Sequence, residues 1–322
     1  MKVLITGASG LIGGALKDWL LADGHSLVCQ SRAFHEPEQN VEWIKHDLNR
    51  DSWDIPALRD IDVVYHLAGQ TSTYSARENP IADLSANVLA LINLLEHFRK
   101  QTRRPFVVLA GTATEVGLTD CLPIDEGMPD HPITYYDISK LTAEAYLKQY
   151  VREGFANGCI LRLANVFGRS KPGQQSDRGI LDKIFNRAIA GKTVTVYGDG
   201  NYLRDYVFID DVVSALVLAA VNGDRTNGRM FLVGSGQGIT LRDAFLKVVL
   251  LANKTSGTQA VIEYVSPPTD LSEIERRNAV IDSAAFKQAT GWEPKFYFDA
   301  ALLAAYSSFT ERSIDISPNS GN

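Results

Sequence analysis

The stretch KVLITGASGLIGG, residues 2–14, decides the fold of this chain. It joins a short β-branched apolar run to an amphipathic segment through glycines at positions 7, 10 and 13. In such a turn Gly7 can permit a tight bend, Gly10 a close backbone approach to a phosphate, and Gly13 close packing of the helix. The N-terminus of the following helix then faces the anion. The spacing is not G-x-G-x-x-G and is weak as a bare pattern, but directly after the first apolar run it predicts a dinucleotide-binding turn.

The same alternation continues through the first half of the chain. Further apolar runs lie at 26–31, 62–69, 106–111 and 158–165, with amphipathic stretches such as 87–100 between them. Repeated β-α-β units with continuously apolar strands predict an α/β fold, a Rossmann-like doubly wound parallel sheet with a smaller C-terminal substrate-binding lobe. We assign residues 1–167 to the dinucleotide-binding Rossmann domain, to which 205–235 return, and 168–322 mainly to the substrate-binding lobe. The polar, glycine-rich stretch 168–179 is predicted to be a long loop and the tail 317–322 to be disordered.

Composition and charge exclude several classes of protein. The chain has 322 residues and a formal net charge of -6, and its scattered basic residues argue against a nucleic-acid partner. Cys29, Cys121 and Cys159 show no metal-ligand spacing, so we expect no metal site and a reducing compartment. The first strand begins directly after Met1, which leaves no room for a signal peptide, and no apolar run approaches the roughly 20 residues of a membrane span. We expect a cytoplasmic protein without a membrane partner.

The end of the second apolar run bears on the choice of cofactor. An acidic residue there would favour NAD through the ribose 2'-hydroxyl, but the run ends in Ser31 and Arg32. Because a guanidinium matches a 2'-phosphate, we predict NADP. The alternative is NAD, with Arg32 facing solvent.

Two further segments could contact the cofactor. Asp47 could accept a hydrogen bond from an adenine amino group or could cap the turn that follows it. The segment HLAG (66–69) ends a strand in small residues, which suits close packing against either a cofactor or a helix. We expect His66 itself to be a core residue.

The stretch TYYDISK (134–140) offers a tyrosine and lysine pair. If it is helical, Tyr136 and Lys140 lie one turn apart on the same face, whereas Tyr135 points elsewhere. An ammonium beside a phenol, whose ordinary pKa is about 10, favours the tyrosinate and lowers that pKa. The pair would then act as a general acid and base near neutral pH. The pattern is common by chance and gains its weight from the glycine turn in the same chain.

A third group should polarise the reacting oxygen. The run VVLAGTATEVG (107–117) leads from a strand into small hydroxyl residues, and Thr112 is the candidate. Thr114 and Glu115 are competing candidates. Alternatively, the Thr112 hydroxyl only bonds its own turn.

The motifs TGASGLIG, HLAG, AGTATEVG, YDISK, RLANVFG, YGDG with RDYVFIDDV, and GWEP occur in this order over nearly the whole chain. Together they resemble the extended short-chain dehydrogenase/reductase family, in its nucleotide-sugar branch of epimerases, dehydratases and ketoreductases. The resemblance implies a catalytic trio at Thr112, Tyr136 and Lys140, with the lysine also bonding the nicotinamide ribose. It implies substrate contacts at Asn165, Arg204 and Arg277, although the adjacent Arg276 leaves that last alignment open. It also implies a homodimer that pairs through helices including 87–100 and 137–152.

The cofactor side of this prediction is a larger set, taken from the glycine turn, the ends of the next three apolar runs and the trio. Its members are Gly7, Ser9, Gly10, Leu11, Ile12, Gly13, Ser31, Arg32, Asp47, Leu48, Leu67, Ala68, Gly69, Tyr136 and Lys140.

The chain departs from this branch at two places. Many members read Ser-Ser-x-x-x-Tyr-Gly where this chain has GTATEVG (111–117), and the dehydratases carry an acidic pair directly after the threonine. Ala113 and Thr114 stand there instead, which disfavours dehydration. The missing acid after the second strand weakens an epimerase with retained NAD.

We therefore expect a ketoreductase that uses NADPH to deliver hydride to C4 of a nucleotide-linked 4-keto-6-deoxy sugar. A nucleotide-sugar 4-epimerase with retained NAD is the alternative. A non-catalytic dinucleotide sensor is a third possibility, against which the intact trio argues.

Overall fold

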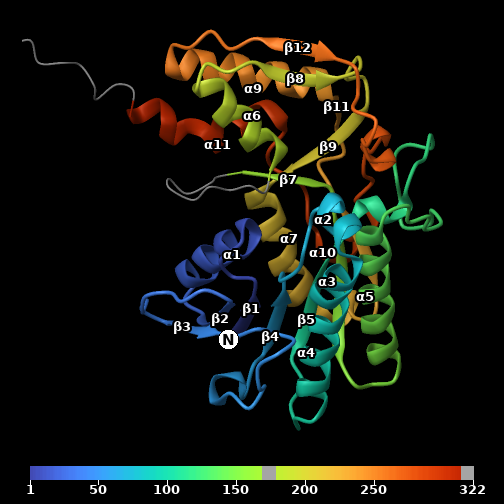
Figure 1. Ribbon diagram of the computed structural model, residues 1–322. Coiled ribbons are helices and arrows are strands. Elements are labelled where there is room, and N and C mark those ends of the chain that lie inside the picture. The colour runs from blue at the N-terminus through green and yellow to red at the C-terminus, as the bar shows by residue number, and fades with distance from the viewer. Residues whose placement is uncertain (169–178, 313–322) are drawn as a thin grey trace, which may run out of the picture.

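The computed structural model describes residues 1–168 and 179–312 (Figure 1). Its centre is a seven-stranded sheet in the order β10-β6-β5-β4-β1-β2-β3, in which every neighbouring pair is parallel. The predicted Rossmann-like doubly wound sheet is thus confirmed. The strands are β1 (Lys2–Thr6), β2 (Ser26–Ser31), β3 (Val41–Lys45), β4 (Val63–His66), β5 (Phe106–Thr112), β6 (Asn157–Leu163) and β10 (Met230–Val233). Apart from Gly168 and Gly179, the predicted loop 168–179 lies outside the described residues, as does the tail 317–322.

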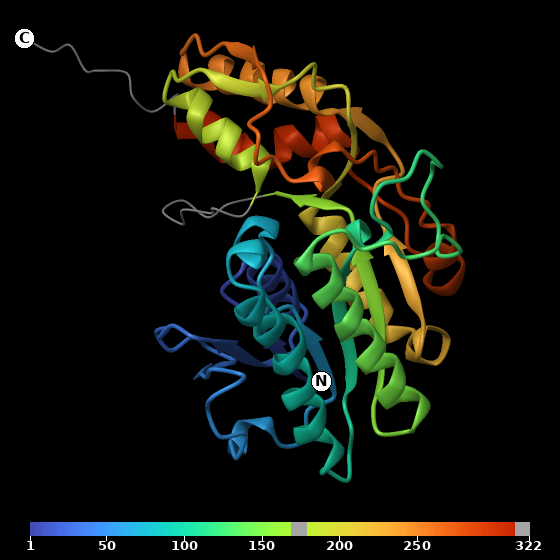
Figure 2. The same cartoon turned by 45° about the vertical axis from the view of Figure 1, so that its right-hand side comes forward.

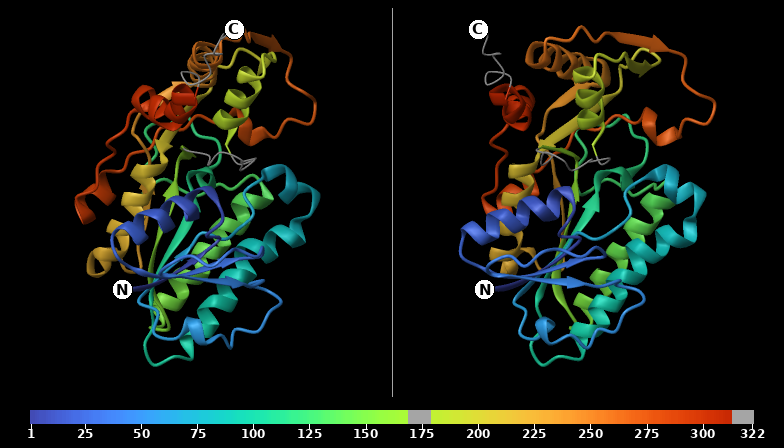
Figure 3. Two further views of the ribbon diagram at one scale, coloured as in Figure 1. Left: turned by 90° about the vertical axis from the view of Figure 1, so that its left-hand side faces the viewer. Right: turned by 60° about the vertical axis from the view of Figure 1, so that its left-hand side comes forward.

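Helices cover both faces of the sheet, as the turned views show (Figures 2 and 3). Successive side chains of a strand point to opposite faces, so Val3 and Ile5 pack in one core cluster and Leu4 in another. The first cluster includes Leu16 from one helix and Val212 from another. The helices of the first face are α1 (Leu11–Ala22), α7 (Ile209–Val221) and α10 (Ala284–Thr290), and the second face is covered by α4 (Ala90–Arg99) and α5 (Tyr135–Arg152).

A third hydrophobic cluster lies beyond the carboxyl ends of the strands. It contains an aromatic group in which Phe167, Tyr206, Phe208 and Phe298 touch one another. Two small sheets belong to this region, one in the order β11-β9-β7 and one formed by β12 and β8. The elements are β7 (Asn165–Phe167), α6 (Ile180–Ile189), β8 (Val194–Tyr197), β9 (Leu203–Phe208), β11 (Gly238–Thr240), α9 (Leu241–Ser256), β12 (Ile262–Val265) and α11 (Phe298–Arg312). We propose that this region is the second lobe, with α7, β10 and α10 returning to the first.

Short elements complete the connections. They are η1 (Pro56–Leu58), α2 (Thr73–Glu78), α3 (Pro80–Leu84), the π-helical turn η2 (Ser85–Leu89), η3 (Ala113–Val116), α8 (Gly223–Thr226) and η4 (Glu273–Arg276). Cys29 and Cys159 are buried in their strands and Cys121 is exposed; all three are free thiols.

The continuous helix Pro80–Arg99 is long and apolar enough to cross a membrane by length and composition alone. This corrects the expectation that no segment reaches that length. Its side chains Val88, Leu91 and Leu95 are buried, however, and they pack in one cluster with Leu4 of β1 and Val64 of β4. This packing is that of a core helix.

Candidate active site

A cleft of about 1300 Å³ lies between the carboxyl ends of the sheet strands and the second lobe. In the strand order the connections reverse direction between β1 and β4, which is where α/β sheets bind ligands. Every residue predicted for the cofactor, the substrate or the catalytic trio lines this one cleft, as does the competing candidate Thr114, whereas Glu115 does not. The fold therefore brings together residues from 7 to 277, and their roles are taken up below.

The glycine turn forms one wall of the cleft. Gly7 has a φ of +68°, and a Cβ there would lie 2.8 Å from the Cα of Ala68. A Cβ on Gly13 would lie 2.4 Å from the carbonyl oxygen of Gly7. Gly10 is the N-cap of helix α1, and among the described residues no side chain caps that end. Backbone N–H groups at an uncapped helix N-terminus fit a pyrophosphate, so this wall suits a dinucleotide.

The ends of β2 and β3 form the adjacent wall. The buried Ser31 hydroxyl lies 3.3 Å from that of Ser9 and accepts a hydrogen bond from the Ala33 N–H. Arg32 is exposed on the rim. One carboxylate oxygen of Asp47 accepts a hydrogen bond from the Asn49 N–H at 3.0 Å, so Asp47 caps the turn after β3.

The predicted trio lies at the far side of the cleft. Tyr136 and Lys140 share a face of α5 and line the cleft, whereas the side chain of Tyr135 is half exposed. Thr112, at the end of β5, also lines the cleft and is one of the groups that influence the pKa of Tyr136. The Lys140 ammonium donates to the carbonyl oxygen of Ala110.

The expected effect of Lys140 on Tyr136 is wrong for this structure. Burial raises the pKa of Tyr136, and the negative charges of Asp137 and Glu115 raise it further. The Lys140 ammonium is directed at Ala110, and burial lowers the pKa of Lys140 itself. Desolvation therefore outweighs the attraction that spacing along the helix predicts.

Thr112 also takes part in the turn that follows β5. Its hydroxyl lies 2.9 Å from that of Thr114, which donates to Asp137 at 2.6 Å. Its backbone N–H donates to the Glu115 carboxylate at 3.2 Å. Thr112 therefore has the position expected for each of its two alternative roles, because it lines the cleft and also caps η3.

Two arginines and an asparagine form a positive corner in the second-lobe wall of the cleft. The buried guanidinium of Arg204 donates to the carbonyl oxygens of Leu203, Glu275 and Arg277. Arg277 lies beside it, with its guanidinium 3.5 Å from the Asn165 side-chain oxygen. Burial and the charge of Arg277 lower the pKa of Arg204 to about 10. An anion would relieve this crowding of positive charge.

A second buried arginine lies behind the trio. The Arg162 guanidinium forms bidentate contacts with Glu144 and with Asp130, and an ion pair with Glu115 at 2.9 Å. Burial next to Glu144 raises the pKa of Glu115 to about 9. Because Arg162 is not among the residues that line the cleft, this cluster supports the site from behind.

Comparison with known proteins agrees with this geometry. The model of the family described as "NAD dependent epimerase/dehydratase family" matches residues 3–234. The chain belongs to this family. The resemblance to extended short-chain dehydrogenase/reductase enzymes that act on nucleotide sugars is thereby confirmed, and the chain is an enzyme of the NAD-dependent type.

Individual members of the family match over almost their whole length. A UDP-glucose 4-epimerase of Mycolicibacterium smegmatis is 30% identical over 97% of this chain and 100% of its own. The crystal structure of a Thermotoga maritima UDP-glucose 4-epimerase with UDP-glucose superposes with a TM-score of 0.84 at 26% identity, covering 98% of this chain and 100% of the other. MoeE5 in complex with UDP-glucuronic acid and NAD has a TM-score of 0.82 at 27% identity, covering 97% and 100%.

Within this family fold, the cleft holds polar groups that the motif analysis missed. Gln30 binds the glycine turn by accepting from the Gly7 N–H at 3.0 Å. Asn87 lines the cleft from the π-helical turn η2, and its side-chain oxygen has no partner among the described residues. His66 is buried as expected, but it lies at the cleft wall with its Nδ1 atom 3.0 Å from the Thr6 hydroxyl. A polar residue inside an apolar run was the signal available for Gln30 and His66, whereas Asn87 stands at the start of an amphipathic stretch and carries no such signal.

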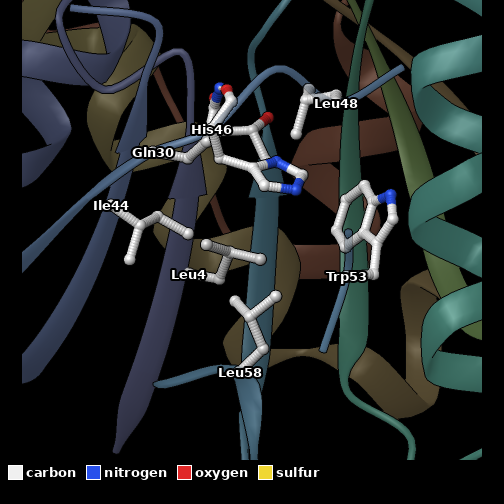
Figure 4. A pocket seen from close by; sticks show the side chains of 8 residues that line it. Leu4, Gln30, Ile44, His46, Leu48, Trp53 and Leu58 are labelled. Atoms are coloured by element: carbon white, nitrogen blue, oxygen red, sulfur yellow. The ribbon is translucent and has the colours of Figure 1, made fainter. Parts of the chain in front are cut away.

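Figure 4 shows a second, smaller gap, with His46 and Trp53 on its wall and Leu58 at its base. It has no room for a water molecule. It is a packing gap and no ligand site.

Proposed function

We propose that the protein interconverts the C4 epimers of a nucleotide-linked sugar by reversible oxidation at C4 with a retained NAD. The observation that carries the proposal is the meeting of Thr112, Tyr136 and Lys140 with the Arg204 and Arg277 corner in one cleft. Supporting it, the relatives with matching chains include two UDP-glucose 4-epimerases. We propose a UDP-sugar as the substrate on the same ground.

The residues take separate roles in this proposal. Tyr136 accepts the proton of the C4 hydroxyl when C4 is oxidised, and it returns the proton to the C4 oxygen when C4 is reduced from its opposite face. Lys140 bonds the nicotinamide ribose. Thr112 contacts the reacting oxygen beside Tyr136. The cofactor supplies the hydride acceptor and donor when bound.

The positive corner holds the diphosphate. Guanidinium groups match phosphate oxygens in a bidentate manner, and Arg204 and Arg277 lie side by side with Asn165 in the cleft wall. We prefer Arg277 to Arg276 for this role because Arg277 contacts Asn165.

A second candidate is the ketoreductase with NADPH, and one observation favours it. Ser31 and Arg32 occupy the end of β2 at the cleft, where an acid would bind the ribose hydroxyls of NAD. The exposed Arg32 could meet a 2'-phosphate.

Absorbance at 340 nm separates the two candidates. The purified protein is mixed with UDP-, dTDP-, GDP- and CDP-sugars, with and without added NADPH, and with Tyr136→Phe as the matched control. An epimerase converts the sugar without net change in NADPH, whereas a ketoreductase consumes NADPH in proportion to its product. If Tyr136→Phe equals the parent on every sugar, both enzyme proposals fail and the dinucleotide sensor remains.

We also propose that the protein is a homodimer in the cytoplasm. An exposed face of α5 carries Ile138 and Tyr146, and Leu89 is exposed on the neighbouring η2. A second copy of the chain would cover these apolar side chains. Light scattering should give twice the chain mass for the parent and the chain mass for Ile138→Asp; a monomeric parent would contradict the proposal.

A further inference from the structure

A chain of hydroxyl groups leads from the reacting tyrosine to a buried carboxylate. Tyr136 and Thr112 both line the cleft, and Thr112 is one of the groups that influence the pKa of Tyr136. The hydroxyls of Thr112 and Thr114 are 2.9 Å apart, and the Thr114 hydroxyl donates to Oδ1 of Asp137 at 2.6 Å. Asp137 has no exposed surface. The chain therefore ends on a group that the substrate cannot touch.

Counting hydrogens fixes the direction of this chain. A hydroxyl has one hydrogen to donate and a carboxylate can only accept. The other carboxylate oxygen of Asp137 accepts from the Thr134 hydroxyl at 2.7 Å, so both oxygens receive a hydroxyl hydrogen. Because Thr114 gives its hydrogen to Asp137, Thr112 must give its own to Thr114. The Thr112 oxygen also accepts from the Thr114 N–H at 3.3 Å, which leaves one lone pair for Tyr136 or for a ligand in the cleft.

We propose that Asp137 is a positioning residue that acts through Thr114 to hold Thr112 as a hydrogen-bond acceptor. The inference rests on the proposed function to the extent that Thr112 and Tyr136 face the reacting oxygen. An acceptor suits a C4 hydroxyl, whereas a C4 ketone needs a donor. Without a ligand, Thr112 is thus arranged to accept a hydrogen bond from the C4 hydroxyl of the alcohol form. The C4 oxygen of the ketone form instead accepts a hydrogen bond from Tyr136, once Tyr136 holds the proton.

A structural role for Asp137 must be separated from this one. Asp137 also occupies the first turn of α5, where its N–H donates to the capping hydroxyl of Thr134 at 3.1 Å. The two roles use different oxygens of the carboxylate, Oδ1 toward Thr114 and Oδ2 toward Thr134. Substitution at position 114 therefore breaks the chain and leaves the cap in place.

The charged groups around Tyr136 affect the pKa that a titration of its hydroxyl would measure. Tyr136 is faced by Asp137 of α5, Glu115 of η3 and Asp83 of α3, all of them negative when ionised. Asp137 is faced by Arg277 of the second lobe. Exchanging Thr114 for valine or serine adds and removes no ionisable side chain, but valine removes a hydrogen bond that lowers the pKa of Asp137. Thr134 makes a second bond of this kind to Asp137, so a shift that occurs in Thr114→Val and not in Thr134→Val reports the hydroxyl chain.

The experiment compares Thr114→Val, which is close in shape but lacks the hydroxyl, with Thr114→Ser, which keeps it. The full chain is used as purified, with 3,5-difluorotyrosine in place of Tyr136 so that the phenol ionises at a pH where the protein stays folded. The fluorine NMR shift follows that ionisation. In Thr114→Val the freed Thr112 hydrogen donates to the phenolate, so we expect a several-fold larger ionised fraction at the same pH. Thr114→Ser should follow the parent.

Two results would overturn the proposal. One is a Thr114→Val titration equal to that of the parent. The other is an equally large shift in Thr134→Val, which removes the helix cap and keeps the Thr114 contact; we expect that variant to lose thermal stability and to titrate like the parent. The titration needs no substrate, so its failure removes the positioning role alone, while a lack of sugar epimerisation removes the proposed function alone.

Discussion

Two buried arginines of this protein have opposite surroundings. Arg162 of β6 and Arg204 of β9 each expose only 2% of their side chains. Arg162 meets the carboxylates of Glu115, Asp130 and Glu144. Arg204 meets backbone carbonyl oxygens, and the Glu275 carboxylate comes only within 3.9 Å of it.

This difference in surroundings indicates which of the two guanidinium groups is available to an anionic ligand. Despite its burial, the carboxylates around Arg162 raise its pKa, whereas burial and the neighbouring Arg277 lower the pKa of Arg204 to about 10. A buried charge without a counter-ion is costly unless a ligand supplies one. Arg162 is therefore a structural cation, and we propose that Arg204 is the cation that binds an anionic ligand.

The largest expected effect is on stability. Arg162→Met leaves buried carboxylates without their counter-ion and should lower the free energy of unfolding by about 3–5 kcal/mol. Arg204→Met removes a guanidinium that no carboxylate neutralises closely, so its loss should be clearly smaller. Denaturant unfolding at pH 7 measures both. Equal losses would erase the distinction between the two arginines.

The next effect is on ligand affinity. Arg204→Met should weaken the binding of a nucleoside diphosphate by about 10- to 100-fold, the size expected for lost hydrogen bonds to a charged group. Titration calorimetry measures it, with Arg162→Met, where it folds, as the control that keeps the parent affinity. A greater loss of affinity in Arg162→Met would reverse the assignment.

The pH dependence of stability tests the cluster around Arg162. The pKa of Glu115 is about 9 in the folded protein against an ordinary 4.5, because the carboxyl is buried next to Glu144. The folded state then holds a proton that the unfolded state has lost. The stability this group contributes is full below about pH 4.5 and is lost as the pH rises through about 9.

The parent should therefore lose up to about 1 kcal/mol of unfolding free energy per pH unit between pH 6 and 8. Glu115→Gln, which is neutral at every pH, should show a flatter profile. Denaturant unfolding at several pH values gives both slopes. Parallel slopes would mean that Glu115 is ionised in the folded protein.

The smallest effect is expected at the rim of the same cluster. The Asp130 side chain is 29% exposed, so solvent screens its contact with Arg162. Asp130→Asn should cost about 1 kcal/mol of unfolding free energy and leave nucleotide affinity unchanged. A loss as large as that of Arg162→Met would show that the cluster fails as a unit.

The sheet and the cleft could be predicted from the sequence because their signals are local. The glycine turn follows β1 within a few residues, and Tyr136 and Lys140 are one helical turn apart. A strand that is buried on both faces is a continuous apolar run, so it can be recognised in the sequence before its neighbouring strands are known.

The buried charges could not be predicted, because their partners are distant in sequence. In the sequence, Asp130 and Glu144 carry no signal and Glu115 is only a competing candidate beside Thr112, and only the fold places the three carboxylates around Arg162. The same cluster explains Gly111, a residue that is unusual for this motif. A Cβ at this position would lie 2.6 Å from a Glu144 carboxylate oxygen. The pKa of Tyr136 was missed because it depends on burial, which spacing along a helix does not report.

The most direct test of the account uses a nucleotide sugar carrying deuterium at C4. We predict a product inverted at C4 that retains the deuterium, since the hydride returns to the molecule it left, and no product with Tyr136→Phe. Proton NMR of the sugar ring reads inversion and label together. Inversion at C4 with equal rates in parent and Tyr136→Phe, or a C4 product whose hydrogen comes from added NADPH, would contradict it.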